Sequence, residues 1–467
     1  MHRFLLSAAH RSSGKTMVSI GLCAALRKRG LEVQPFKKGP DYIDPMWLSQ
    51  AAGRPCYNLD PYLSDGDELR RAFLRRSRVA QACLVEGNMG LFDGISLDGS
   101  NSSAALAATL GLPVILVVDC RGMTRGIAPL IVGYQAFDPN IRIAGIILNR
   151  VGGQRHESKL RAVLEHYTRI PVIGAIPESP ELAIHERHLG LVPSNEAGDA
   201  AERIACLERI ISAHVDIDQL LAITGEAPAG QAIAPLSLAT SQQRKPIPAG
   251  VRIGIARDAA FGFYYPDDLE ALESAGAELV PFDTLRDVRL PAVDGLFIGG
   301  GFPEVMAAGL AANASLRADL GRAIEQGMPV YAECGGLMYL TRSITWHGET
   351  HAMVGAIPAD TVMHRKAVGR GYVELEATAD HPWLPAGSPP IRAHEFHYSS
   401  LENADPGLRY AWRMRRGHGI DGRRDGIVHH NVLGAYSHLR SVLGLDWPAR
   451  FVASVRERKT RPAAACA

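Results

Sequence analysis

The sequence lacks long hydrophobic runs, any excess of charge and any paired cysteine motif. Its longest apolar stretches, such as residues 113–118 and 143–148, are far shorter than the roughly 20 residues of a membrane-spanning helix. The 50 basic and 49 acidic side chains give a formal net charge of +1, whereas general nucleic-acid binding needs a basic face against phosphates. We therefore expect no membrane segment and no nucleic-acid partner.

Cysteine is scarce and scattered. The seven cysteines are odd in number, and none forms a Cys-x-x-Cys pair. This distribution argues against a disulfide framework or a zinc site and favours a reducing compartment. Because residues 1–9 also show no cleavable signal pattern, we expect the protein to be cytoplasmic.

Short apolar runs alternate with amphipathic stretches in the first half of the chain. This alternation predicts a parallel sheet with helices on both faces, and residues 15–29 are expected to form its first helix. The same pattern restarts near residue 251, which predicts a second α/β sheet. The expected strands are 4–8, 33–36, 82–85, 113–118, 142–148 and 172–176, then 252–256, 279–282, 295–298 and 329–332.

A stretch rich in Pro, Ala, Gln and Ser separates the two patterned halves, and it is long enough to act as a linker. Beyond residue 455 the chain becomes charged and then rich in alanine, which predicts a frayed tail. We therefore expect a first domain at 1–224, a linker at 225–250, a second domain at 251–455 and a tail at 456–467.

A phosphate-binding loop is expected between the first strand and the first helix. The segment Ala-His-Arg-Ser-Ser-Gly-Lys-Thr at 9–16 matches Gly-x-x-x-x-Gly-Lys-Thr except at Ala9. Alanine is tolerated there if that position keeps a negative φ. Backbone N–H groups and the helix N-terminus would hold the phosphates, Lys15 would reach the terminal ones, and Thr16 would meet Mg²⁺. The alternative is an ordinary strand–helix turn.

Two acidic clusters follow the next strands. One contains Asp41 and Asp44 within 38–45, and the other contains Glu86 and Asp93 within 86–94. Both are expected at the carboxyl edge of the parallel sheet, where ligands bind and where a carboxylate can hold the Mg²⁺ of a nucleotide. A single aspartate could equally be a turn residue, but Glu86 directly follows an apolar strand and needs a partner there.

A cysteine elbow is expected in the second half. Residues 329–337 read as an apolar strand, then Cys334 and two glycines, then a helical pattern, which is the layout of a nucleophile elbow. Upstream, the three glycines at 299–301 end another strand, so N–H groups of Gly300 and Gly301 could form an oxyanion hole. A thiolate needs a base, and His438, His394 and His397 compete for that role. The alternative is a buried structural thiol.

These segments together resemble the cobyrinate and hydrogenobyrinate a,c-diamide synthase family. The resemblance runs from about residue 3 to residue 445 and rests on an ordered set of motifs rather than on the phosphate loop alone. The matching segments are GPDYIDP (39–45), EGNMGLFDG (86–94), LVVDCRGM (116–123), ERHLGLVP (186–193), GGGFPE (299–304), YAECGGLMYL (331–340) and AHEFHYS (393–399).

The resemblance implies an α/β chain with a P-loop parallel-sheet domain similar to dethiobiotin synthetase, followed by a class I glutamine amidotransferase domain. It implies Cys334 as the glutaminase nucleophile and His438 as its base. Since Arg440 stands two positions after that base and no glutamate does, the pair is expected to act as a dyad. The implied nucleotide is ATP at Ser12, Ser13, Gly14, Lys15 and Thr16, and the implied Mg²⁺ ligands are Thr16, Asp44 and Glu86.

The implied reaction is the ATP- and glutamine-dependent conversion of tetrapyrrole side-chain carboxylates to amides through an acyl phosphate. The substrates would then be glutamine, ATP and an anionic tetrapyrrole. Cobyrinate and hydrogenobyrinate, nickel-sirohydrochlorin and siroheme all remain open, and Asn88 and the loop at 98–102 bear some likeness to the siroheme branch. The sequence leaves the oligomeric state open, a homodimer included.

A reading from another class is a partition-type P-loop ATPase that acts as a binding module. Proteins of that type usually carry an extra lysine early in the phosphate loop, whereas this chain has His10 and Arg11 there. A cysteine elbow also has no place in that reading.

Overall fold

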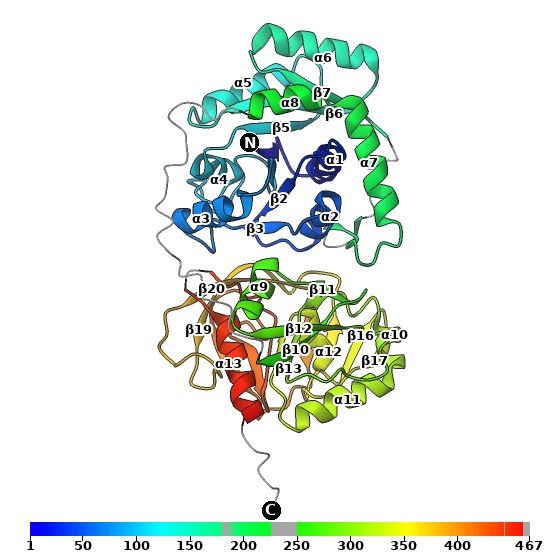
Figure 1. The fold of residues 1–467 in the computed structure, drawn as a ribbon, viewed down its shortest axis with the longest axis vertical. Helices are drawn as coiled ribbons and strands as arrows, with labels where there is room; N and C mark the ends of the chain where they lie inside the picture. The colour runs from blue at the N-terminus through cyan, green and yellow to red at the C-terminus, as the bar shows by residue number, and fades with distance from the viewer. Residues whose placement is uncertain (180–185, 188–189, 226–249, 443, 461–467) are drawn as a thin grey trace, which may run out of the picture. The chain divides into compact units, whose positions relative to one another are not determined.

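The computed structural model describes residues 1–179, 186–187, 190–225, 250–442 and 444–460 (Figure 1). The chain divides into two compact units, Met1–Ser241 and Gln242–Ala467. The division falls within the stretch predicted to be a linker. Residues 226–249 of that stretch lie outside the described residues.

A seven-stranded, all-parallel sheet forms the centre of the first unit, as the alternating pattern predicted. Its strand order is β3-β2-β4-β1-β5-β6-β7. The inner strands are apolar on both faces because helices cover both sides of the sheet. The strands are β1 (His2–Ala8), β2 (Val33–Lys38), β3 (Tyr57–Leu59), β4 (Ala82–Glu86), β5 (Val114–Asp119), β6 (Ile143–Val151) and β7 (Val172–Pro177). The short strands β8 (Glu186–Arg187) and β9 (Gly190–Leu191) pair separately.

Helices cover both faces of this sheet (Figure 1). One face carries α1 (Lys15–Lys28), α2 (Ile43–Ala52), α7 (Ala200–His214) and α8 (Ile217–Thr224). The other face carries α3 (Gly66–Ser77), α4 (Ser103–Leu110), α5 (Ile127–Phe137) and α6 (Gln154–Tyr167).

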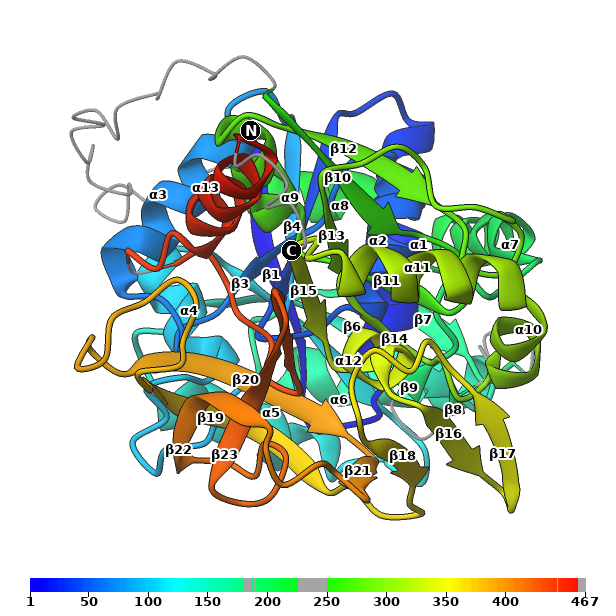
Figure 2. The same cartoon turned by 90° about the horizontal axis from the view of Figure 1, so that it is seen from below.

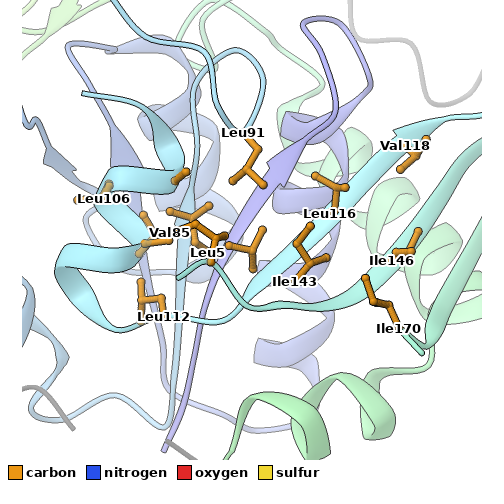
Figure 3. Close-up of a cluster of buried hydrophobic side chains, with 14 of the residues drawn as sticks. Leu5, Val85, Leu91, Leu106, Leu112, Leu116, Val118, Ile143, Ile146 and Ile170 are labelled. Carbon is orange, nitrogen blue, oxygen red and sulfur yellow. The ribbon is translucent and has the colours of Figure 1, made fainter. Parts of the chain in front are cut away.

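The core beneath α3 to α6 holds the strand ends in place (Figure 3). Leu5, Val85, Leu116 and Ile146 of four strands are fully buried there, against helix residues such as Leu106. Each such side chain contributes about 1.5–3 kcal/mol through burial. The carboxyl ends of β1, β2 and β4 are thereby fixed beside one another. The loops that follow these strands therefore begin at the same edge of the sheet.

A nine-stranded sheet forms the centre of the second unit, in the order β12-β10-β13-β15-β24-β23-β22-β19-β20. The first five strands are parallel, and the remaining four run antiparallel to their neighbours (Figure 2). The parallel strands are β10 (Val251–Ala256), β12 (Ala277–Phe282), β13 (Gly295–Ile298), β15 (Val330–Glu333) and β24 (Val432–Ala435). The antiparallel strands are β19 (Gly369–Ala377), β20 (Ile391–His397), β22 (Arg409–Arg416) and β23 (Arg424–His429).

Smaller sheets and two helical layers complete the second unit. The strand β11 (Phe261–Phe263) pairs with β14 (Gly300–Gly301), and a four-stranded sheet contains β16 (Ser343–Trp346), β17 (Glu349–Ala352), β18 (Asp360–Met363) and β21 (Ser399–Glu402). One face of the large sheet packs α9 (Pro266–Ser274) and α13 (Trp447–Thr460). The other packs α10 (Ala307–Ala312), α11 (Ala314–Glu325) and α12 (Gly335–Leu340). Throughout the described residues, no helix combines the length and the apolar character needed to cross a bilayer.

The last helix differs from the predicted tail. We expected the chain to fray from Arg456, yet α13 continues to Thr460. Its charged side chains reach the body of the unit: Arg456 donates to the Ala275 carbonyl at 3.1 Å, and Lys459 pairs with Asp294 at 2.9 Å. These anchors hold a segment whose composition alone indicated disorder. Residues 461–467 lie outside the described residues.

Candidate functional site

The phosphate loop lies between β1 and α1, as expected. Ser12 and Gly14 have positive φ values of 63° and 86°, and α1 begins at Lys15. A Cβ atom on Gly14 would lie 2.2 Å from Asn149 Nδ2, so glycine is required both by the backbone angle and by the available space. Ala9 is not among the residues with a positive φ, so alanine is tolerated at that position.

Three side chains from outside the loop fix its shape. Asn149 Nδ2 donates to the Ser13 carbonyl at 2.8 Å, and Arg150 Nη1 donates to the Ser12 carbonyl at 3.0 Å. Tyr134 of α5 donates its hydroxyl to the Ala9 carbonyl. These bonds pair the carbonyl groups of Ala9, Ser12 and Ser13. Backbone N–H groups at a helix N-terminus are suited to holding an anion.

Oxygen ligands and ammonium groups converge beside the loop. The Thr16 hydroxyl donates to Glu86 Oε1 at 2.7 Å and to Asp44 Oδ2 at 3.2 Å. Lys15 Nζ lies 3.1 Å from the same Glu86 oxygen. The three residues expected to surround Mg²⁺ are therefore brought together, although they come from α1, α2 and the end of β4.

Lys37 is a member of this cluster that the sequence analysis did not single out. Its Nζ lies 3.0 Å from Glu86 Oε1 and contacts Asp44, with Asp41 at 3.6 Å. Burial alone would lower the pKa of this ammonium, but the surrounding carboxylates raise it well above its usual value. Nothing in the sequence indicated that this lysine is buried among carboxylates, although Asp41 and Asp44 follow it by only four and seven positions.

The carboxylates respond differently to the same surroundings. Burial and the neighbouring Asp44 raise the pKa of Asp41 to about 6. Burial would likewise raise the pKa of Asp44, but attraction to Lys37 and Lys15 lowers it overall. Asp44 is thus held in the ionised form that cation binding requires.

The donor set fits a magnesium ion shared with a nucleotide. Glu86 is fully buried, and its Oε2 has no hydrogen-bond partner among the described residues. Mg²⁺ prefers oxygen ligands and commonly takes one or two carboxylates plus substrate phosphates. In the described part of the chain, no three His, Cys, Asp or Glu side chains form a complete metal cage. The Thr16 hydroxyl and phosphate oxygens would therefore have to complete the coordination.

The edge of the sheet near this cluster carries the loop that bears a siroheme likeness. The Asn88 N–H donates to Ser103 Oγ at 3.2 Å, and Ser102 caps α4 by accepting from the Ala105 N–H. Phe92 packs against Tyr134, the residue that holds the phosphate loop. These contacts give the loop a structural role.

The second unit contains the expected cysteine elbow. Cys334 follows β15 and precedes α12, with φ 48° and ψ −101°. This region is strained for a residue with a side chain and is typical of nucleophile elbows. A Cβ atom on Gly336 would lie 2.2 Å from the Ile298 carbonyl oxygen, so the helix can follow the turn this closely only with glycine there.

The glycine loop lies against the elbow. A Cβ on Gly335 would lie 3.0 Å from the Gly301 nitrogen, and one on Gly300 would lie 3.0 Å from Cε1 of His438. The backbone of Gly301 thus packs against Gly335, the residue after the cysteine, and that of Gly300 packs against His438. Backbone N–H groups beside a nucleophile are the kind of donor that an oxyanion hole uses.

Of the three candidate bases, His438 is the one bonded to the thiol. It shares a hydrogen bond with Cys334, while its Nδ1 lies 3.1 Å from Glu333 Oε2. Burial would lower the pKa of His438, but these hydrogen bonds raise it to about 10. The imidazolium is therefore favoured beside the sulfur.

The other two histidines, His394 and His397, pack around the pair of Cys334 and His438. His394 stacks on the His438 ring, with centroids 4.8 Å apart, and its burial holds its pKa well below the usual value. His397 stacks on Tyr436 and its Nδ1 lies 2.8 Å from the Ser399 carbonyl oxygen. Sequence spacing could not separate the three, because β20 and the turn after β24 meet only in the folded sheet.

The chain resembles known proteins over both units. Residues 11–192 match the CobQ/CobB/MinD/ParA nucleotide binding domain, and residues 252–441 match the CobB/CobQ-like glutamine amidotransferase domain. A cobyrinate a,c-diamide synthase of Magnetococcus marinus is 46% identical over 459 residues, which cover 98% of this chain and 97% of that protein. The chain belongs to the cobyrinate a,c-diamide synthase family. A second relative with the same name, from Methanosarcina acetivorans, is 43% identical over 94% of this chain and 92% of its own length.

Membership of the cobyrinate a,c-diamide synthase family confirms the resemblance and the predicted fold class. The first unit contains a nucleotide-binding domain and the second a glutamine amidotransferase domain. The protein is an enzyme of the glutamine-dependent carbon–nitrogen ligase type. A solved structure, that of PurLQS from Thermotoga maritima, aligns over 45% of this chain and 99% of its own at 17% identity with a TM-score of 0.34, a similarity too low to bear on function.

Proposed function

We propose that this enzyme amidates the a and c side-chain carboxylates of cobyrinate, with ATP activating each carboxylate and glutamine supplying the nitrogen. The observation that carries the proposal is the presence on one chain of two separate reactive clusters. One joins a phosphate loop to Lys15, Thr16 and Glu86, and the other joins a strained Cys334 to His438. The name of the full-length relatives favours cobyrinate among the tetrapyrroles.

In the second unit, the Cys334 thiolate would attack the side-chain carbonyl carbon of glutamine. The carbonyl electrons move to oxygen, and N–H groups of Gly300 and Gly301 would stabilise that oxyanion. As the intermediate collapses, the C–N bond breaks and His438 gives its proton to the departing nitrogen, which leaves as ammonia. Water then hydrolyses the thioester to glutamate and restores the thiol.

In the first unit, the cobyrinate carboxylate would attack the γ-phosphorus of ATP to give an acyl phosphate and ADP. Ammonia then attacks the acyl carbon, and phosphate leaves as the amide forms. Lys15 and the loop N–H groups of Ser12, Ser13 and Gly14 would hold the phosphates. Thr16, Asp44 and Glu86 would hold Mg²⁺, which neutralises phosphate charge when it is bound.

The experiment that tests the substrate is an end-point assay with ATP, Mg²⁺ and glutamine against cobyrinate, hydrogenobyrinate, nickel-sirohydrochlorin and siroheme. Mass spectrometry would follow the change from acid to amide, which lowers the mass by about 1 Da per site. We expect two amides on cobyrinate. Amidation of siroheme or nickel-sirohydrochlorin instead would replace the substrate and leave the chemistry intact, whereas ATP hydrolysis without any amidation would contradict the synthetase assignment.

The division of labour is tested by two variants. Cys334→Ala should lower glutamine-dependent amidation by about 10³-fold or more while ammonia-dependent amidation persists. Lys15→Ala should abolish amidation with either nitrogen source, because both need the activated carboxylate. Matched controls are Cys206→Ala, a half-buried thiol of α7, and Lys28→Ala, a lysine of α1 that pairs with Glu208. Loss of ammonia-dependent activity in a folded Cys334→Ala protein would contradict the division.

A further inference from the structure

Glu333 is a buried carboxylate directly before the nucleophile, and both of its oxygens are engaged. Oε2 lies 3.1 Å from His438 Nδ1. Oε1 accepts from the Tyr331 hydroxyl at 2.6 Å and from the Leu439 N–H at 3.1 Å. The side chains of Glu333 and His438 are only 3% and 4% exposed, so no bulk water competes for these bonds.

The contact assigns the two nitrogens of the His438 ring. A carboxylate at Nδ1 accepts a hydrogen bond, so that nitrogen carries the proton and Nε2 remains for the Cys334 thiol. Gly300 packs against Cε1 of the same ring so closely that any side chain there would meet it at 3.0 Å. The ring is thus fixed in one orientation, with Nδ1 toward Glu333.

The side chain two positions after the histidine makes its contacts elsewhere. Arg440 stands two positions after His438, and its guanidinium turns to α9, where it pairs with Asp267 and lies 4.6 Å from the Tyr265 ring centroid. Asp268 is buried nearby and accepts from the Ser441 N–H at 2.8 Å. These groups form an ion pair and a turn that are separate from the contact between Glu333 and His438.

We propose that Glu333 is a positioning residue that completes a Cys334–His438–Glu333 triad, with the carboxylate supplied by the residue before the nucleophile. The proposal rests on the proposed glutaminase role of Cys334 and His438. Glu333 would hold the tautomer that accepts the thiol proton and would stabilise the imidazolium that results. The dyad expected from sequence is then a triad whose third member lies on β15.

The groups that face His438 predict how Glu333 affects the pH dependence of glutaminase activity. Cys334 and Glu333 meet the ring from β15 and its end, and His394 stacks on it from β20. The raised pKa of His438, about 10, implies that the imidazolium persists until the pH approaches that value. Removing the Glu333 charge withdraws one of its two partners, so the alkaline limit of activity should move to lower pH.

The test is Glu333→Gln in the full-length enzyme, which keeps the side-chain size and an acceptor oxygen. We expect kcat for glutamine hydrolysis to fall about 10²–10⁴-fold, with KM for glutamine little changed and ammonia-dependent amidation retained. The rate of Cys334 alkylation by iodoacetamide, followed by peptide mass spectrometry, should lose its wild-type pH dependence. Tyr331→Phe is the matched control, because it removes the other side-chain partner of Glu333 and leaves the carboxylate beside His438.

The outcomes separate this proposal from the function it rests on. A wild-type enzyme without glutaminase activity would contradict the proposed function itself. An active wild-type enzyme with a Glu333→Gln variant of unchanged kcat and alkylation profile would overturn the triad, as would equal losses in Glu333→Gln and Tyr331→Phe. If Glu333→Gln does not fold, Glu333→Asp decides: its shorter carboxylate should lower kcat, and wild-type kcat in that variant would overturn the proposal.

Discussion

The backbone of Cys334 adopts a strained conformation that places its side chain beside His438. Its φ of 48° and ψ of −101° lie in a region that L-residues seldom adopt, and such a conformation costs about 1–3 kcal/mol. The elbow projects the sulfur out of the sheet toward His438. The packing of strands β13, β15 and β24 around the elbow offsets this strain.

The strain predicts an inverted order of stability for two substitutions. Cys334→Gly should be more stable than Cys334→Ala by about 1 kcal/mol, because glycine relieves the positive φ whereas alanine retains it. At an ordinary position glycine is the less stable of the two. Urea unfolding of both variants, followed in the second unit by tryptophan fluorescence, measures the difference, and a more stable alanine variant would argue against strain at the elbow.

His381 predicts acid sensitivity of the second unit. Its Nδ1 accepts from the N–H groups of Trp383 and Leu384, both at 3.0 Å, and burial lowers its pKa to about 3. Since the folded pKa lies below the unfolded value of about 6.5, the stabilisation is complete above pH 6.5. It is lost as the pH falls toward 3, by about 1.4 kcal/mol per unit of pH.

The measurement is the free energy of unfolding between pH 4 and pH 7 for wild type and for His381→Asn. Asparagine keeps a neutral acceptor near the same N–H groups, so its unfolding should depend less on pH in this range. His351, half-buried on β17 beside Glu349, offers the control variant His351→Asn. Equal pH dependence in wild type and His381→Asn would contradict the assignment.

Residues that act through distant partners limited what the sequence could reveal. Lys15, Thr16, Asp44 and Glu86 stood out because each follows a strand that ends at the same sheet edge. Lys37 did not stand out, because a lysine near the end of a strand is ordinarily solvated. Glu333 falls inside the predicted elbow, but its contact with His438 spans 105 positions, and no spacing rule anticipates it.

Among the elements, the phosphate loop combines backbone and packing requirements most tightly. Gly14 needs a positive φ of 86°, and its missing side chain leaves room for Asn149, which holds the Ser13 carbonyl. The conformation of the loop therefore depends both on Gly14 within it and on Asn149 at the end of β6.

Gly14→Ala should accordingly weaken the first unit by about 1–3 kcal/mol and abolish ATP-dependent amidation. Gly30→Ala is the matched control: Gly30 has a similar φ of 84° but nothing within 4 Å of its Cβ position. The excess destabilisation of Gly14→Ala over Gly30→Ala, measured by thermal unfolding, isolates the contact with Asn149. Glutamine hydrolysis by Gly14→Ala should persist, and ATP-dependent activity equal to wild type would contradict the role of the loop.

The central strands could be predicted closely, and the peripheral ones could not. Buried parallel strands appear as short apolar runs between amphipathic segments, so β1, β4, β5 and β13 fall within a residue or two of expectation. The antiparallel strands β19, β20, β22 and β23 escaped because their exposed edges mix charged and apolar residues without clean alternation. The helical end of α13 escaped because its anchors, such as Ala275, lie elsewhere in the chain.

At the scale of the whole molecule, two units with their own cores predict two unfolding events. The first unit buries a cluster around Leu5 and Ile146 on one face of its sheet and apolar side chains of α1, such as Ile20 and Leu22, on the other. The second unit buries clusters on each face of its sheet. Mg·ATP should raise the melting temperature of one event only. At about 100 times Kd the expected gain is about 2.7 kcal/mol, or roughly 5–10 °C for a unit of this size.

Calorimetry with and without Mg·ATP measures this shift, and glutamate or a glutamine analogue should act on the other event. Lys15→Ala should remove the response to nucleotide while keeping both transitions. A single transition that moves as a whole with either ligand would contradict the independence of the two cores.

The ammonium groups of Lys15 and Lys37 affect how the first unit would bind a metal ion. They pair with Glu86 and Asp44, so much of the negative charge of the acidic cluster is already neutralised by the protein's own side chains. Binding of Mg²⁺ would then require these ammonium groups to move away from the carboxylates that the ion takes as ligands. Such a movement favours a metal that arrives with phosphates, since these give the displaced lysines new anions to hold.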